Sequence, residues 1–158
     1  MTESITLDAL DRRIVALLQR DASLSNAELA ERVGSTAPSC WRRVRALEDA
    51  GVLKGAVRLA DPAALGQDVN ILCDVRLRSY DADTIAAFEN FVRDEARIME
   101  CYSLSGERDY LMRIVATSVS DYEHFLMRTL LRHPSIAGAS SHFALSVTKY
   151  QTALPVRS

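Results

Sequence analysis

The stretch that decides the fold is residues 25–51, SNAELAERVGSTAPSCWRRVRALEDAG. Ser25 and Glu28 form a capping-box pattern, in which each side chain accepts a hydrogen bond from a backbone amide at the start of a helix. We expect that helix to end at Gly34, because glycine readily takes the left-handed conformation that closes a helix. Residues 35–38 then supply a second cap and a proline suited to a first helical turn. The stretch predicts two helices joined by a tight turn, the second ending at its last glycine.

The second of these helices has two different faces. Projected at about 100° per residue, it places Cys40, Val44 and Leu47 on one side, where they can pack against a core. Trp41 lies at the boundary and is expected to close that core. The opposite side combines small residues with arginines, which can approach a duplex and reach phosphates or guanine edges. The residues predicted to contact DNA, on this surface and in the segments beside it, are Ser35, Thr36, Ser39, Arg42, Arg43, Arg45, Lys54 and Arg58.

The flanking segments extend this pair into a larger domain. Apolar residues repeat at helical spacing over residues 7–20, which predicts an amphipathic first helix. Residues 52–59 alternate loosely around a glycine, as a short β-hairpin does. Three helices and a basic hairpin predict a winged helix-turn-helix.

The distribution of charge supports a nucleic-acid partner, although the formal net charge of the chain is −2. DNA binding depends on local cation density, and five of the cations fall between residues 36 and 58 against two acidic residues. A three-helix module whose solvated arginines serve only protein contacts is the alternative. The order of cap, turn, proline and basic outward face favours double-stranded DNA.

The remaining residues have a different periodicity. A proline and a glycine break the pattern near residues 61–67, where we place a linker. Strands are predicted at 69–77, 98–104, 110–116 and 136–148, with helices after the first strand and from a capping box at 120–123. This order is ferredoxin-like, βαββαβ, with two helices on one face of an antiparallel sheet. The fold class is α+β, with domains at 1–60 (DNA binding), 61–67 (linker) and 68–158 (effector binding and oligomerisation).

Apolar residues occur at both parities of the predicted strands. Leu72, Met99, Cys101, Met112 and Ile114 would leave a sizeable apolar patch on an uncovered sheet. Pairing of two such sheets in a homodimer is our hypothesis for covering this face.

The composition excludes several other functions. The start of the chain has no signal-peptide pattern and no apolar run is long enough to span a membrane, so we expect a cytoplasmic protein without a membrane partner. Cys40, Cys73 and Cys101 are far apart, which argues against a zinc site and for reduced thiols. No motif links a histidine to a nucleophile. We therefore expect no catalytic residues, no metal and no cofactor.

The order of these segments resembles the Lrp/AsnC family of feast/famine transcriptional regulators, over nearly the whole chain. The resemblance also includes the tail 148–155, which is similar to one branch of the family. The residues that carry it are Leu7-Asp8, Asp11-Arg12, Ser25–Ala30, Pro38–Val44, Leu47-Glu48, Gly51–Leu53, Gly55, Asp61-Pro62, Ser105-Gly106, Asp109–Leu111, Leu130 and Pro134.

The resemblance implies a dimer formed through the C-terminal sheets, assembling further to a tetramer or octamer, and an amino-acid effector held near the turn between the second and third strands. A zwitterion needs backbone N–H donors for its carboxylate and an acidic group for its ammonium. Asp109 can supply that charge, or it can simply cap a hairpin that Gly106 turns. Arg108 stands where relatives commonly carry an aromatic residue, which points to a different effector, an anionic ligand or none. The implied effector residues are Ser105, Gly106, Glu107, Arg108, Asp109, Tyr110, Ser140 and Ser141.

Two other functions remain open at this stage. An architectural protein that compacts DNA without an effector would use the same helices. An enzyme on the ferredoxin-like domain is the weaker alternative, since fold does not settle function.

Overall fold

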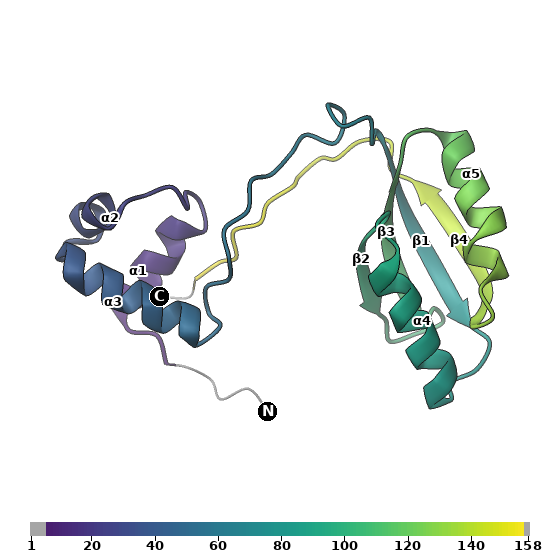
Figure 1. Ribbon diagram of the computed structural model, residues 1–158, viewed down its shortest axis with the longest axis horizontal. Helices are drawn as coiled ribbons and strands as arrows, with labels where there is room; N and C mark the ends of the chain where they lie inside the picture. The colour runs from purple at the N-terminus through teal and green to yellow at the C-terminus, as the bar shows by residue number, and fades with distance from the viewer. Residues whose placement is uncertain (1–5, 157–158) are drawn as a thin grey trace. The chain divides into compact units, whose positions relative to one another are not determined.

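The computed structural model describes residues 6–156, which fall into two compact units (Figure 1). Among the described residues, one unit comprises 6–58 together with 149–156, and the other comprises Leu59–Thr148. The sequence had assigned all of residues 68–158 to the second domain. The structure instead groups the end of the chain with the DNA-binding domain, through long-range packing that no local pattern encodes.

The first unit is a three-helix bundle whose helices begin at side-chain caps. The carboxylate of Asp8 accepts hydrogen bonds from two backbone amides of the first helix, and Ser25 and Glu28 form the predicted capping box. Gly34 ends the second helix in the left-handed conformation with φ of 69°. The buried core contains Ile14, Leu29, Val33, Cys40 and Leu47. The helices are α1 (Ala9–Leu18), α2 (Asn26–Val33) and α3 (Ala37–Asp49).

The hairpin predicted over residues 52–59 is not formed. Residues 54–60 have no strand in the structure, so the bundle has no wing. The amides of Val52 and Leu53 both donate to the carbonyl of Leu47, at 2.9 and 3.0 Å, and both side chains pack on the helical core. These apolar residues close the end of α3 instead of starting a strand.

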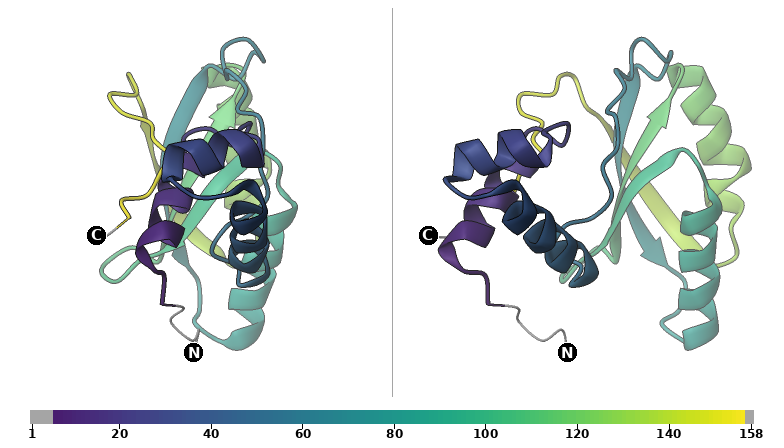
Figure 2. Two further views of the ribbon diagram at one scale, coloured as in Figure 1. Left: turned by 90° about the vertical axis from the view of Figure 1, so that its left-hand side faces the viewer. Right: turned by 60° about the vertical axis from the view of Figure 1, so that its left-hand side comes forward.

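The second unit has the predicted ferredoxin-like topology. Its four strands form an antiparallel sheet in the order β2-β3-β1-β4. Helices α4 and α5 both cover one face of that sheet (Figure 1 and Figure 2). The elements are β1 (Val69–Leu77), α4 (Ala82–Asp94), β2 (Ile98–Ser103), β3 (Tyr110–Ala116), α5 (Val119–Arg128), the 3-10 turn η1 (Leu130–Arg132) and β4 (Ile136–Phe143).

Two predicted boundaries were wrong. The N-cap of α5 is Ser118 and not Ser120, because Ser118 accepts from the amide of Asp121 while the Asp121 carboxylate accepts from Thr117. Strand β4 ends at Phe143 and not at residue 148. Phe143 lies opposite Ile71, and the Ala144 amide still donates to the Asn70 carbonyl at 2.8 Å. Because β1 begins at Val69, residues 146–148 would find no backbone partner on it.

The face of the sheet away from the helices is more polar than predicted. Met112 and Ile114 are buried under the helices, and Cys101 packs against the same core. On the open face the Arg113 guanidinium pairs with Glu100 at 2.9 Å. The large apolar residues of the strands that are exposed are Leu72, Met99, Tyr102 and Phe143, and of these Phe143 lies on the helix side, where its ring packs edge-on against Tyr122 of α5.

Candidate DNA interface and effector turn

The local sequence fixes α3 by its two ends and by one face. The hydroxyl of Thr36 caps its first turn and Pro38 lies within that turn, where a missing N–H costs nothing. Cys40 and Leu47 are buried against the other helices. Packing of these two residues therefore orients the opposite side of α3 outward, and this orientation does not depend on a ligand.

Arg43 is held inside the unit. Its guanidinium donates to Asp8 at 2.6 Å and to Asp11 at 2.7 Å. The amide of Asp11 and this guanidinium together lower the pKa of Asp8, and the two carboxylates raise the pKa of Arg43. Arg43 joins α3 to the start of α1, so we remove it from the proposed DNA contacts.

Arg42 and Arg45 lie on the exposed side of α3. The Arg45 guanidinium is 3.3 Å from Glu48 in a pair that is largely open to solvent, and such surface pairs are weak. Within residues 6–156, Arg42 makes no ion pair or side-chain hydrogen bond. Both cations are available to phosphates or bases without breaking a strong internal contact.

Trp41 does not close the core, which corrects the prediction. Its side chain is 53% exposed. One turn further along the helix lies Arg45, so the indole and this guanidinium share one side of α3. A large exposed aromatic beside cations is a signal for an interface, and the sequence reasoning missed it because Trp41 borders the apolar stripe.

The other predicted DNA residues are distributed around α3. Ser35 and Thr36 lie in the turn before it, with the Thr36 hydroxyl accepting from the Ser39 amide at 3.4 Å. Lys54 and Arg58 are exposed in the segment that follows the helix. These residues surround the outward face, although the strand geometry expected for the last two is absent.

The turn between β2 and β3 is attached to the end of β1 through Asp109. One carboxylate oxygen accepts from the Leu77 amide at 2.7 Å and the other from the Tyr80 hydroxyl at 2.9 Å. The Asp109 amide donates to the Val75 carbonyl at 3.1 Å. Gly106 has φ of 139°, a conformation that favours glycine. Asp109 thus acts as a structural cap of the turn in this chain.

Tyr80 is a residue of this turn region that the sequence analysis missed. Its ring is largely exposed, and its hydrogen bond to the Asp109 carboxylate raises the pKa of its hydroxyl. Tyr80 follows β1 and is far in sequence from Asp109, so no local pattern reveals the contact.

The predicted effector residues do not all meet in one chain. Ser105, Gly106, Glu107 and Arg108 are exposed in the turn. Tyr110 packs on Phe88 of α4, with ring centroids 4.6 Å apart. Ser140 pairs in register with Asp74 on the open face, about 10 Å from β3 because β1 lies between them.

Ser141 faces the other side of the sheet from Ser140. Adjacent strand residues point to opposite faces, and the Ser141 hydroxyl is hydrogen-bonded to that of Tyr122 from α5. Burial raises the pKa of Tyr122, so this phenol stays protonated. Within one chain Ser141 and Tyr110 therefore contact the helices that cover the sheet, and their role as effector residues stays a prediction.

The remaining titratable residues that the structure describes form no metal site. Among residues 6–156 no three His, Cys, Asp or Glu side chains are grouped to hold a metal. Cys73 is buried, and desolvation raises its thiol pKa. No helix in the same described range is long and apolar enough to cross a membrane.

A helix-turn-helix with a cationic outward helix, followed by a separate ferredoxin-like unit, defines the class: DNA-binding regulators with a ligand-binding domain. The AsnC-type helix-turn-helix domain matches residues 7–48 and the Lrp/AsnC ligand binding domain matches residues 70–154. The chain belongs to the Lrp/AsnC family of transcriptional regulators. The family consists of DNA-binding regulators and not of enzymes.

Individual relatives are similar over nearly their full length. The DNA-binding transcriptional activator DecR of Escherichia coli (strain K12) is 34% identical, covering 95% of this chain and 99% of its own. The glutamate uptake regulatory protein of Zymomonas mobilis is 35% identical, covering 95% and 91%. The crystal structure of a transcriptional regulator from Neisseria meningitidis in complex with L-Met has a TM-score of 0.91 at 35% identity, covering 95% and 97%.

Proposed function

We propose that this regulator recognises specific DNA sequences through α3, with Arg42 and Arg45 as the main contacts and Trp41 beside them. The observation that carries the proposal is that the arginines of α3 have different surroundings. Arg43 is committed to two carboxylates of the bundle, whereas Arg42 and Arg45 are exposed. The internal clamp fixes the helix and leaves its outer cations for the major groove.

The proposed effector is an amino acid or a related small anion bound at the turn 105–108. Gly106 provides accessible backbone at an exposed turn, and Arg108 provides a cation for a carboxylate. The L-Met complex of the Neisseria meningitidis regulator supports an amino acid as the chemical class. A second copy must complete the site, because Ser140 and the turn are separated by a strand within one chain.

The assembly we propose is a homodimer paired through the open sheet faces, which can associate further. Leu72 and Tyr102 give that face apolar area. One charge pair on that face is matched within the chain, Arg113 with Glu100, and the Asp74 carboxylate lies 3.5 Å from His142, which carries a charge only when protonated. A face whose charges are already paired is less costly to bury.

A gel shift on the region upstream of the protein's own gene tests the proposal. We expect a specific complex that competitor DNA of random sequence does not remove, and a loss of affinity in Arg42→Ala. Repeating the titration with each of the twenty amino acids tests the effector, because a ligand shifts binding only if it binds two states differently. Specific binding that no amino acid changes would contradict the effector proposal. Binding without sequence preference would favour an architectural protein.

A further inference from the structure

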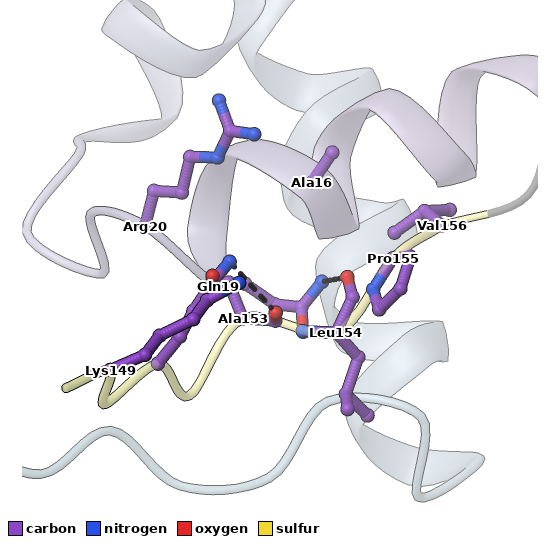
Figure 3. Close-up of a pocket in the computed structure, with 9 residues that line it drawn as sticks. Ala16, Gln19, Arg20, Lys149, Ala153, Leu154, Pro155 and Val156 are labelled. Carbon is purple, nitrogen blue, oxygen red and sulfur yellow. Dashed lines mark hydrogen bonds between the residues drawn. The ribbon is translucent and has the colours of Figure 1, made fainter. Parts of the chain in front are cut away.

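The end of the chain is bound to the first helix of the DNA-binding unit. The side-chain amide of Gln19, the C-cap residue of α1, makes two hydrogen bonds to one residue of the tail. The Leu154 amide donates to Gln19 Oε1 at 2.7 Å, and Gln19 Nε2 donates to the Leu154 carbonyl at 3.1 Å. Figure 3 shows the Gln19 amide against this stretch of backbone. The pair has the pattern by which a neighbouring β-strand is recognised.

The remaining contacts fix the path of the tail without depending on the side chain of Leu154. That side chain is 74% exposed. Pro155 restricts the residue before it to an extended backbone, and Val156 packs on the apolar core of the helical bundle. Backbone recognition by Gln19 and one apolar anchor therefore hold the segment.

The contact area borders a pocket of about 690 Å³ between the end of α1 and the tail. Its lining combines helix and tail residues: Ala16, Gln19, Arg20, Lys149, Gln151, Ala153, Leu154, Pro155 and Val156. The tail thus forms one wall of a surface feature that α1 alone lacks.

We propose that residues 149–156 are a strap by which the chain returns to its DNA-binding unit, so that this unit is connected to the effector-binding unit at two points of the chain and not one. The first crossing falls between Arg58 and Leu59, and the second between Thr148 and Lys149. A unit attached at one point samples more orientations, and restricting it on DNA costs more entropy. The strap lowers that cost and strengthens DNA binding. This consequence rests on the proposed DNA-binding function.

The test uses two variants of one residue in the full chain. Leu154→Pro removes the N–H that Gln19 accepts while keeping an extended backbone. Leu154→Ala is the matched control, because it keeps both backbone groups and changes only an exposed side chain. Gln19→Ala removes the same contact from the helix side.

Hydrogen exchange measured by mass spectrometry tests the docking independently of DNA. In the unaltered protein we expect the Leu154 amide, which donates to Gln19, to exchange about tenfold more slowly than in a synthetic peptide of residues 149–156. Gln19→Ala should abolish this protection, and Leu154→Ala, which keeps the backbone amide, should retain it. Equal exchange in the protein and the peptide would overturn the strap, as would protection that Gln19→Ala leaves unchanged.

DNA affinity tests the consequence, with a duplex from upstream of the protein's own gene as the probe. Leu154→Pro should weaken binding about tenfold and Leu154→Ala less than about twofold. Lost protection with unchanged affinity would overturn the role in DNA binding. If the unaltered protein binds no duplex, the proposed function fails, and the exchange measurements alone decide whether the strap exists.

Discussion

Replacing Arg43 with alanine should destabilise the DNA-binding unit, whereas replacing Arg42 should weaken DNA binding at nearly unchanged stability. The two arginines are sequence neighbours on α3 with different surroundings. Arg43 donates to Asp11 at 2.7 Å, and their side chains are 32% and 17% exposed. Arg42 is exposed, and none of the ion pairs found among residues 6–156 involves it.

The size of the effect follows from the exposure of the Arg43–Asp11 pair. A charge-assisted hydrogen bond contributes about 1.5 to 3 kcal/mol when protected from water, and an exposed ion pair contributes about 0 to 1 kcal/mol. An intermediate exposure predicts a loss of about 1 to 2 kcal/mol in the free energy of unfolding. In a unit of this size, 1 kcal/mol corresponds to about 4 to 8 °C in Tm.

Tryptophan fluorescence during urea unfolding measures this loss in the right unit, because Trp41 is the only tryptophan of the chain. We expect Arg43→Ala to lower the urea midpoint and Arg42→Ala to leave it in place. In the gel shift, Arg42→Ala should lose about 1 to 3 kcal/mol of binding with relaxed sequence preference if it reads a base. Unchanged stability of Arg43→Ala, together with a loss of DNA affinity equal to that of Arg42→Ala, would refute the clamp.

Three further predictions follow from the geometry. Trp41 emission should change on addition of specific duplex and Trp41→Phe should bind more weakly, while an emission that ignores DNA would remove Trp41 from the interface. Asp109→Ala should lower the free energy of unfolding of the C-terminal unit by about 1 to 2 kcal/mol, measured by urea denaturation, because the Leu77 amide loses its acceptor. Tyr80→Phe removes only a hydroxyl of an exposed residue and should lower it by less than about 0.5 kcal/mol. Equal losses in the two variants would contradict this prediction. Burial lowers the pKa of His133 below 6.5, so the unfolded chain binds the proton first and stability should decrease as pH falls below 6.5, with no effect above it. His133→Asn keeps an acceptor for the Ser135 amide that now donates to Nδ1 and should remove part of this dependence, whereas His124→Asn on the exposed side of α5 should not.

The parts of the fold that the sequence predicted correctly depend on local rules. Alternation over Val69–Leu77 gave β1 with its bounds, and β3 was likewise placed at Tyr110–Ala116. The cap at Ser25 and the glycine at the end of α2 depend on neighbours within a few residues. All the residues that determine such features lie close together in the sequence, so the sequence alone can predict them.

The incorrect predictions involve partners that are distant or that compete. The pattern at Val52 and Leu53 resembled a strand, but the amides of both residues donate to the Leu47 carbonyl at the end of α3 and are not free to pair with a strand. The length of β4 is limited by the start of β1, which lies far away in sequence. The alternation of side chains along a strand could have shown that Ser140 and Ser141 lie on opposite faces of the sheet, because neighbouring strand residues point to opposite sides.

The sequence indicated which charged residues lie near the candidate sites, but it did not indicate which of them bind other residues of the same chain. The arginines of α3 were selected together, and only the carboxylates of α1 distinguish Arg43 from its neighbours. Asp109 was chosen for its charge, and the structure uses that charge to hold the turn against β1. Roles of this kind depend on which charges already have partners.

The grouping of residues 149–156 with the first unit also has a consequence for how the protein is made. The effector-binding unit is an uninterrupted insert within the chain of its host, and synthesis proceeds from the amino end. The three helices therefore leave the ribosome before the insert, but the segment that Gln19 binds emerges after the entire insert. The DNA-binding unit is the first to begin folding and the last to be completed.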